Sequence, residues 1–231
     1  NTVADLIPQI LPGSADEFRL LTDAVGGKGY RQIDINLGCP FPMIAGKHKG
    51  AGMLLYPAQV AEVLAPIAEY PEIQFSLKMR LGWENVSECM VLVELLNAIR
   101  LSRIALHART GKQQYKGHPD LEAFQGFYEL CQHPLYYNGG IESLSDIRQI
   151  LTRFPLLKGV FIGRGLLSSP LLAKEFKGNE TFLPEQRMSI YFAFHEELFS
   201  AYSQVLQGET QLLVKMKTLW EYFLPETDRK L

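Results

Sequence analysis

The first three-quarters of the chain alternate between short apolar runs and longer segments in which apolar residues recur at helical spacing. This order predicts βα units arranged around a parallel sheet. The six expected strands are Leu6–Leu11, Gln32–Asn36, Gln74–Met79, Ile104–His107, Leu135–Asn138 and Gly159–Ile162.

Three of the connecting segments predict amphipathic helices. Their apolar positions are Val60, Val63, Leu64 and Ile67 in the first, Leu92, Leu96 and Ile99 in the second, and Leu144, Ile147 and Leu151 in the third. Ser143, followed three residues later by Asp146, predicts a capping box where the third helix begins. These apolar faces indicate packing against the sheet, not a functional surface.

After Phe176 the pattern changes to helices alone. A polar break at residues 177–180 precedes Pro184 and two apolar stripes. The stripes are Tyr191, Phe192, His195, Leu198, Phe199 and Tyr202, and then Leu212, Leu213, Met216, Leu219, Trp220 and Phe223. We expect a barrel portion over residues 1–178 and a small all-α domain over residues 183–231.

The composition is that of a globular protein with one large or two unequal domains, since 47% of its 231 residues are hydrophobic and 21% are charged. No apolar run approaches the ~18 residues of a membrane span, and the first residues lack the basic and apolar regions of a signal peptide. We expect a cytoplasmic protein without membrane contact. Three cysteines without CxxC spacing and histidines without ligand spacing predict neither a disulfide framework nor a metal site.

The net charge of −2 gives no global reason to expect nucleic acid as a partner. Any RNA contact would therefore need a local basic patch. The candidates are Lys47, His48 and Lys49, then Lys112 and Lys116, then Lys215, Lys217, Arg229 and Lys230. Small clusters of this kind are also typical of solvated surface.

Polar and glycine residues gather where the predicted strands end, which is where barrel enzymes place their active sites. The five segments are Asn36–Pro40, Lys78–Arg80, His107–Arg109, Asn138–Gly140 and Gly163–Gly165. The last two suit a phosphate-bearing ligand, because glycines let backbone N–H groups approach it. The alternative for either one alone is a tight turn.

Cys39 lies at the predicted mouth of the barrel. Its thiol, with an ordinary pKa of ~8.5, could donate a proton or act as an activated nucleophile, and position alone does not decide between these roles. Lys78 and His107 would point toward the same mouth and would suit an anionic cofactor; a solvent-exposed lysine and a hydrogen-bonded core histidine are the alternatives. Arg80 and Arg109 could equally be ion-pair partners within the scaffold.

Taken together, these segments resemble the tRNA-dihydrouridine synthase family. The similar motifs are Gln9, Asn36-Leu37-Gly38-Cys39-Pro40, Gly50-Ala51-Gly52-Met53-Leu54-Leu55, Lys78-Met79-Arg80-Leu81-Gly82-Trp83, His107-Ala108-Arg109-Thr110, Gln114-Tyr115-Lys116-Gly117, Asn138-Gly139-Gly140-Ile141 and Gly163-Arg164-Gly165-Leu166-Leu167. The segment Lys217-Thr218-Leu219-Trp220-Glu221-Tyr222 resembles the family's helical tRNA-binding domain. The match covers nearly the whole chain, in the family's order.

The resemblance implies an α/β fold, a TIM-type (β/α)8 barrel, that binds FMN and reduces uridine in tRNA. NADPH would reduce the flavin, its hydride would pass from N5 to C6 of a flipped uridine, and Cys39 would protonate C5 as the general acid. Gln9 and Lys78 would contact the flavin ring. The residues implied at its ribityl phosphate end are His107, Asn138, Gly139, Gly140, Gly163 and Arg164. Those expected to bind substrate are Asn36, Arg80, Arg109 and Lys217, in a monomeric protein.

The chain departs from the family's pattern in three places. The family's barrel begins with two strands that are not recognisable here, so the six predicted strands correspond to strands three to eight. We expect roughly 60 residues upstream, the usual size of two βα units, to complete the barrel. Phe41 stands where the family commonly has serine, and Gly140 where many members have aspartate; we expect both to affect substrate subtype and not reaction type.

Two other functions remain open at this stage. A different FMN barrel oxidoreductase could act on a small molecule, although it would not need the helical domain with its basic residues. A catalytically inactive RNA-binding relative is the second alternative, and the presence of Cys39, Lys78 and His107 argues against it.

Overall fold

A computed structural model describes residues 6–223, and these divide into two compact units. The first unit holds residues 6–139 and 150–161, and the second holds residues 140–149 and 162–223. The first contains every strand of the described chain, whereas the second is helical.

Six parallel strands form one sheet in the order of the sequence, as predicted. They are β1 (Gln9–Ile10), β2 (Gln32–Leu37), β3 (Gln74–Gly82), β4 (Ile104–Thr110), β5 (Leu135–Asn138) and β6 (Gly159–Phe161). β1 is shorter than expected, because Pro8 has no N–H to donate and pairing with β2 is limited to Gln9 and Ile10. β3 and β4 continue three residues beyond their predicted ends.

Strict alternation gives the sheet one apolar and one polar face. The side chains that pack outward under the helices are fully buried: Ile33, Ile35, Leu37, Phe75, Leu77, Met79, Ile104 and Leu106. Their sequence neighbours point to the other face and are polar: Asp34, Asn36, Ser76, Lys78, Arg80 and His107. In-register pairing sets Asp34 beside Gln9 and Ser76, and His107 beside Arg80 and Asn138.

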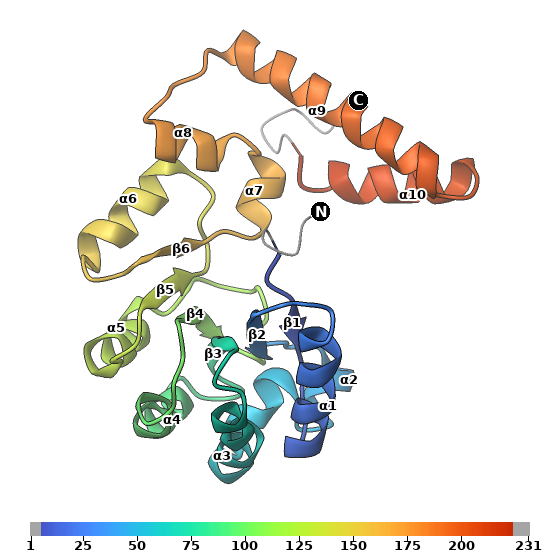
Figure 1. Ribbon diagram of the computed structural model, residues 1–231. Coiled ribbons are helices and arrows are strands. Elements are labelled where there is room, and N and C mark those ends of the chain that lie inside the picture. Colours follow the sequence, from blue (N-terminus) through green and yellow to red (C-terminus); the bar gives the residue numbers. More distant parts are fainter. Residues whose placement is uncertain (1–5, 224–231) are drawn as a thin grey trace. The chain divides into compact units, whose positions relative to one another are not determined.

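The helices of the first unit lie outside the curved row of strands (Figure 1). They are α1 (Ala15–Gly26), α2 (Pro42–Ala45), α3 (Pro57–Leu64), α4 (Glu88–Asn97) and α5 (Leu121–Leu130), with 3-10 turns η2 (Gly50–Leu55) and η3 (Ala65–Glu69). The predicted helices around Val60 and Leu92 are confirmed as α3 and α4. Ile67 falls in η3 and Ile99 lies beyond α4, so both helices end earlier than their apolar spacing suggested.

Aromatic side chains join the helices to the sheet. Phe124 of α5 is fully buried and meets the rings of Tyr137 and Phe154 at centroid distances of 5.0 Å each. Phe18 of α1 packs in the same way on Phe75 of β3, at 5.2 Å. These contacts fix the helices against the apolar face of the strands.

The second unit contains four helices of its own and the first residues of a fifth. They are α7 (Arg164–Ser168), α8 (Leu172–Gly178), α9 (Pro184–Val205) and α10 (Glu209–Trp220), together with the start of α6 (Leu144–Arg153). The capping box predicted for α6 is present: Asp146 N–H donates to Ser143 Oγ (3.2 Å), and Ser143 N–H donates to Asp146 Oδ2 (2.8 Å).

A small core of Leu171, Tyr191 and Phe223 holds these helices, and Arg187 forms an ion pair with the buried carboxylate of Glu175. The predicted stripes are only partly packed, because Phe192 is 58% and Leu213 68% exposed. None of the helices in residues 6–223 combines the length and the apolar character that crossing a membrane requires.

Phe124→Ala should lower the free energy of unfolding by about 3–5 kcal/mol, because it removes a buried ring that contacts two others. Urea unfolding measures the change. Leu130→Ala is the matched control on the same helix, since Leu130 is 51% exposed and should change stability by less than about 0.5 kcal/mol. Equal effects of the two substitutions would contradict this account of the core.

Candidate active site

A buried carboxylate, Asp34, organises the polar face of β1, β2 and β3. Asp34 is 8% exposed and accepts hydrogen bonds from Ser76 Oγ (2.6 Å) and from Gln9 Nε2 (2.6 Å). Because a carboxylate can only accept, the second bond fixes which end of the Gln9 amide carries the nitrogen. Gln9 is thereby held with its Oε1 toward the next residue of the network.

That next residue is Asn36, which carries the network to the backbone of Cys39. Its Nδ2 donates to Gln9 Oε1 (2.7 Å), and its Oδ1 accepts from the backbone N–H groups of Gly38 and Cys39, both at 2.9 Å. Hydrogen bonds between side chains of β1, β2 and β3 therefore hold the turn that contains Cys39. The sequence predicted Gln9, Asn36 and Cys39 as site residues but missed Asp34 and Ser76.

Lys78 lies on the same face, in register with Asn36. Its side chain is partly buried, and no carboxylate in residues 6–223 forms an ion pair with it. Burial lowers the pKa of Lys78 below its ordinary value, the positive charge of Arg80 lowers it further, and Asp34 opposes both. A partly buried cation without a carboxylate partner suits an anionic ligand.

Arg80 is buried, and three backbone carbonyls occupy its guanidinium group. Nε donates to Gly38 O (3.0 Å), and Nη1 donates to Thr110 O (2.8 Å) and Gln114 O (2.7 Å). Burial lowers the pKa of Arg80 to about 10, with Tyr115 opposing the shift. The geometry favours the scaffold role that the sequence left open, because Arg80 ties the Cys39 turn to the loop after β4.

His107 and Arg109 form a second buried polar pair. Arg109 Nη1 lies 3.3 Å from His107 Nε2, and Arg109 Nη2 donates to Gly117 O (2.9 Å). Since a guanidinium can only donate, this contact requires Nε2 of His107 to accept, which places the proton of the neutral ring on Nδ1.

Asn138 and Gly139 continue this row at the end of β5. Asn138 Nδ2 donates to Phe161 O (2.8 Å), which ties β5 to β6. Gly139 has a φ of 135°, and a Cβ there would lie 3.2 Å from Cδ2 of His107. The glycine lets the backbone pass close to the imidazole ring.

Cys39 differs from the two other cysteines in its surroundings. Cys39 and Cys131 are both partly exposed and Cys89 is buried, but only Cys39 lies in the turn held by Asn36, where its carbonyl accepts from Ala51 N–H (3.0 Å). Burial raises the pKa of the Cys89 thiol to about 12 and also raises that of Cys131, so both thiols stay protonated and unreactive at neutral pH.

The remaining predicted site residues lie in the second unit. Gly140 has a φ of 61°, and Gly163 and the exposed Arg164 begin the short helix α7. A Cβ on Gly165 would lie 2.2 Å from the carbonyl oxygen of Ile141, so these two glycine loops are in close contact. Lys217 is exposed in the last turn of α10.

The other basic candidates are also on the surface where they can be described. Lys47, Lys112, Lys116 and Lys215 are exposed, and Lys112 pairs with Glu84 at 2.6 Å. Arg229 and Lys230 lie outside the described residues. In residues 6–223 no three His, Cys, Asp or Glu side chains come together as a candidate metal site.

A family model described as dihydrouridine synthase (Dus) matches residues 5–226. The chain belongs to the dihydrouridine synthase family. The resemblance predicted from the strand-end motifs is confirmed by this match, which includes both the strands and the C-terminal helices.

Curated Dus relatives come from several bacteria. A probable tRNA-dihydrouridine synthase of Aquifex aeolicus is 36% identical over 63% of this chain and 46% of its own length. A probable tRNA-dihydrouridine synthase of Rhizobium leguminosarum bv. phaseoli is 32% identical over 60% of this chain and 44% of its own length. The tRNA-dihydrouridine synthase B of Vibrio cholerae is 28% identical over 70% of this chain and 51% of its own length. The chain spans about half the length of the curated relatives it matches.

Among solved structures, morphinone reductase matches with a TM-score of 0.53 and 14% identity, over 75% of this chain and 51% of that one. At this identity the likeness concerns the fold alone. Together with the Dus match and the parallel sheet with its outer helices, it confirms the predicted TIM-type barrel class, of which the described chain holds six strands.

Lys78→Met should raise the free energy of unfolding of the ligand-free protein at pH 7. The pKa of the Lys78 amine is lower in the folded state than in the unfolded state, so the amine holds its proton less tightly in the folded protein. At pH values below the unfolded pKa of about 10.4, Lys78 therefore lowers the free energy of unfolding. The advantage of the methionine variant should therefore shrink as the pH approaches that value. Urea titrations at several pH values test this, with the exposed Lys28→Met as control. If Lys78→Met were less stable than the wild type at pH 7, the lowered pKa of Lys78 in the folded protein would be contradicted.

Proposed function

We propose that this protein is a flavin-dependent tRNA-dihydrouridine synthase, which reduces the 5,6 double bond of uridines in tRNA. One observation carries the proposal beyond family membership: the turn of Cys39 is held by the Asn36, Gln9 and Asp34 network beside a buried cation, Lys78. A thiol held in this way suits proton transfer to a bound base.

The residues present fit FMN. In the first unit, Lys78 offers a buried positive charge and Gln9 an oriented amide for the flavin ring, while His107, Asn138 and Gly139 are assigned to the ribityl phosphate end. In the second unit, we assign Gly140, Gly163 and Arg164 to the phosphate, because left-handed or unhindered glycines expose backbone N–H groups and Arg164 adds charge.

The reaction divides between cofactor and protein. When bound, FMN reduced by NADPH supplies the hydride that is added at C6 of the uridine. Cys39 donates its proton to C5, so that one hydride and one proton saturate the double bond. Asn36 and Arg80 together hold the peptide group between Gly38 and Cys39, and Arg109 fixes the tautomer of His107.

The tRNA contacts are assigned from both units. Asn36, Arg80 and Arg109 act at the base by positioning, because each of them donates hydrogen bonds to other groups of the protein. Lys217 is exposed and can meet a phosphate directly. We assign tRNA binding to a helical domain over residues 183–231, after a barrel portion over residues 1–178, in a monomeric cytoplasmic protein.

The test of this function is to map dihydrouridine by mass spectrometry in tRNA from cells that lack the gene. We expect the modification to disappear at one position and to return with the wild-type gene. An unchanged profile in cells without a redundant enzyme would overturn the proposal.

Cys39→Ala should retain FMN but form dihydrouridine about 10²–10⁴-fold more slowly, because only the general acid is lost. Single-turnover assays on unmodified tRNA measure the rate, and the flavin absorbance of the purified protein measures cofactor content. Cys131→Ala is the control, since that thiol is protonated and remote from the Asn36 turn. Wild-type rates in Cys39→Ala would rule out the proton-donor assignment.

A further inference from the structure

The loop that follows Cys39 folds back onto that residue. Gly50 has a φ of 56°, and a Cβ on it would lie 2.9 Å from Cys39 Cβ and 2.8 Å from Cys39 O. Ala51 N–H then donates to the same carbonyl at 3.0 Å. The position of Cys39 therefore depends on where residues 49–51 are held.

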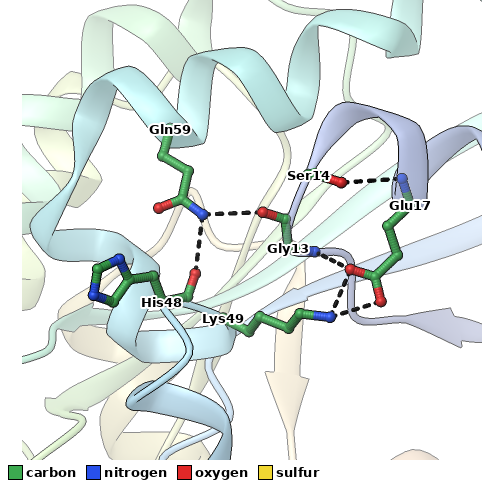
Figure 2. Close-up of polar contacts among 6 residues, drawn as sticks. All are labelled: Gly13, Ser14, Glu17, His48, Lys49 and Gln59. Carbon is green, nitrogen blue, oxygen red and sulfur yellow. Dashed lines mark hydrogen bonds and ion pairs between the residues drawn. The ribbon is translucent and has the colours of Figure 1, made fainter.

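Lys49, immediately before Gly50, is anchored on Glu17 in the first turn of α1 (Figure 2). Its Nζ lies 2.6 Å from both carboxylate oxygens of Glu17, and Glu17 Oε2 also accepts from Gly13 N–H at 2.8 Å. The two side chains are only 25% and 35% exposed. The hydrogen bond from Lys49 lowers the pKa of Glu17, so the carboxylate of Glu17 is ionised at neutral pH.

Gly13 and Gln59 complete the junction between the loop of residues 48–51 and the loop that follows β1. The Lys49 stem passes directly over Gly13, where a Cβ would lie 2.3 Å from Lys49 Cε. Gln59 Nε2, from α3, donates to Gly13 O (3.0 Å) and to His48 O (3.3 Å), as Figure 2 shows. One side chain thus links the backbones of both loops.

The backbone beside Lys49 needs such an anchor. His48 has a φ of 54°, a left-handed conformation that is unfavourable for a residue with a side chain and that persists where the surroundings hold it. Its ring stacks on Tyr56 with the centroids 4.2 Å apart. Residues 48–50 therefore contain two left-handed positions between the Tyr56 stack and the Cys39 contact.

We propose that Lys49 and Glu17 are positioning residues for Cys39: their ion pair holds residues 48–51 in the conformation that sets the thiol for proton delivery. The part that concerns proton delivery rests on the proposed function, whereas the part that concerns the placement of the thiol does not. An exposed ion pair with no such role would contribute little beyond a small stability term.

The test compares Glu17→Gln, Lys49→Met and the reversed pair Glu17→Lys with Lys49→Glu in the full-length protein. Glu17→Gln is the mild variant, because a glutamine carbonyl can still accept from Gly13 N–H while the ion pair is lost. Arg19→Met is the matched control. Arg19 is on the same helix as Glu17, but it forms its ion pair with Glu69 (2.7 Å) and not with the loop of residues 48–51.

Two quantities are measured: the rate of Cys39 alkylation by iodoacetamide, resolved by peptide mass spectrometry, and the single-turnover rate of dihydrouridine formation. In both single variants we expect the alkylation rate of Cys39 to change and dihydrouridine formation to slow about tenfold. Flavin content and KM for tRNA should stay within about twofold of wild type. The reversed pair restores the charge interaction but not the acceptor for Gly13 N–H, so it should recover part of the lost rate. Flavin content and KM are the quantities that a general structural defect would change.

The outcomes separate the two proposals. An unchanged Cys39 alkylation rate in Glu17→Gln, as in Arg19→Met, would overturn the positioning role. The wild-type protein could also form no dihydrouridine, which would reject the proposed function. In that case, a changed alkylation rate in Glu17→Gln would still support the role of the ion pair in placing the thiol. If Lys49→Met fails to fold, Glu17→Gln alone decides.

Discussion

The period of two along the parallel strands is the constraint on which the rest of the molecule depends. It sends Ile33, Ile35 and Leu37 under the helices and sends Asp34 and Asn36 to the opposite face. A slip of one residue in β2 would bury two polar side chains under the helices and would expose the apolar ones to the site. The burial of the apolar face therefore fixes the register, and the register in turn brings the polar side chains together.

A polar face inside a protein is stable only where its groups find partners. Asp34 meets this need by accepting from Ser76 and Gln9, and Arg80 meets it with three backbone carbonyls. Lys78 differs from Arg80, because neither a carboxylate nor a set of backbone carbonyls is recorded as its partner in the described residues. A charged side chain that lacks a partner on such a face lowers stability, and charges of this kind are typical of ligand-binding sites.

The strands and the capping box of α6 could be predicted because both depend on residues near one another in sequence. The ends of β3 and β4 could not, since Arg80 and Arg109 resemble loop residues until their distant carbonyl partners are known. Asp34 was missed for the same reason: its partner Gln9 is 25 residues away. Cys39 and Lys78 could be chosen from their strand-end positions, but the residues that hold them could not.

Arg80 joins two segments that are far apart in the sequence. It donates hydrogen bonds to the carbonyls of Gly38, next to Cys39, of Thr110, the last residue of β4, and of Gln114 in the loop that follows. Because one rigid, planar group makes all three bonds, neither segment can shift without stretching bonds to the other. A displacement of Gln114 would therefore strain the bond from Arg80 to Gly38 O, so the loop after β4 and the cysteine turn share one mechanical support.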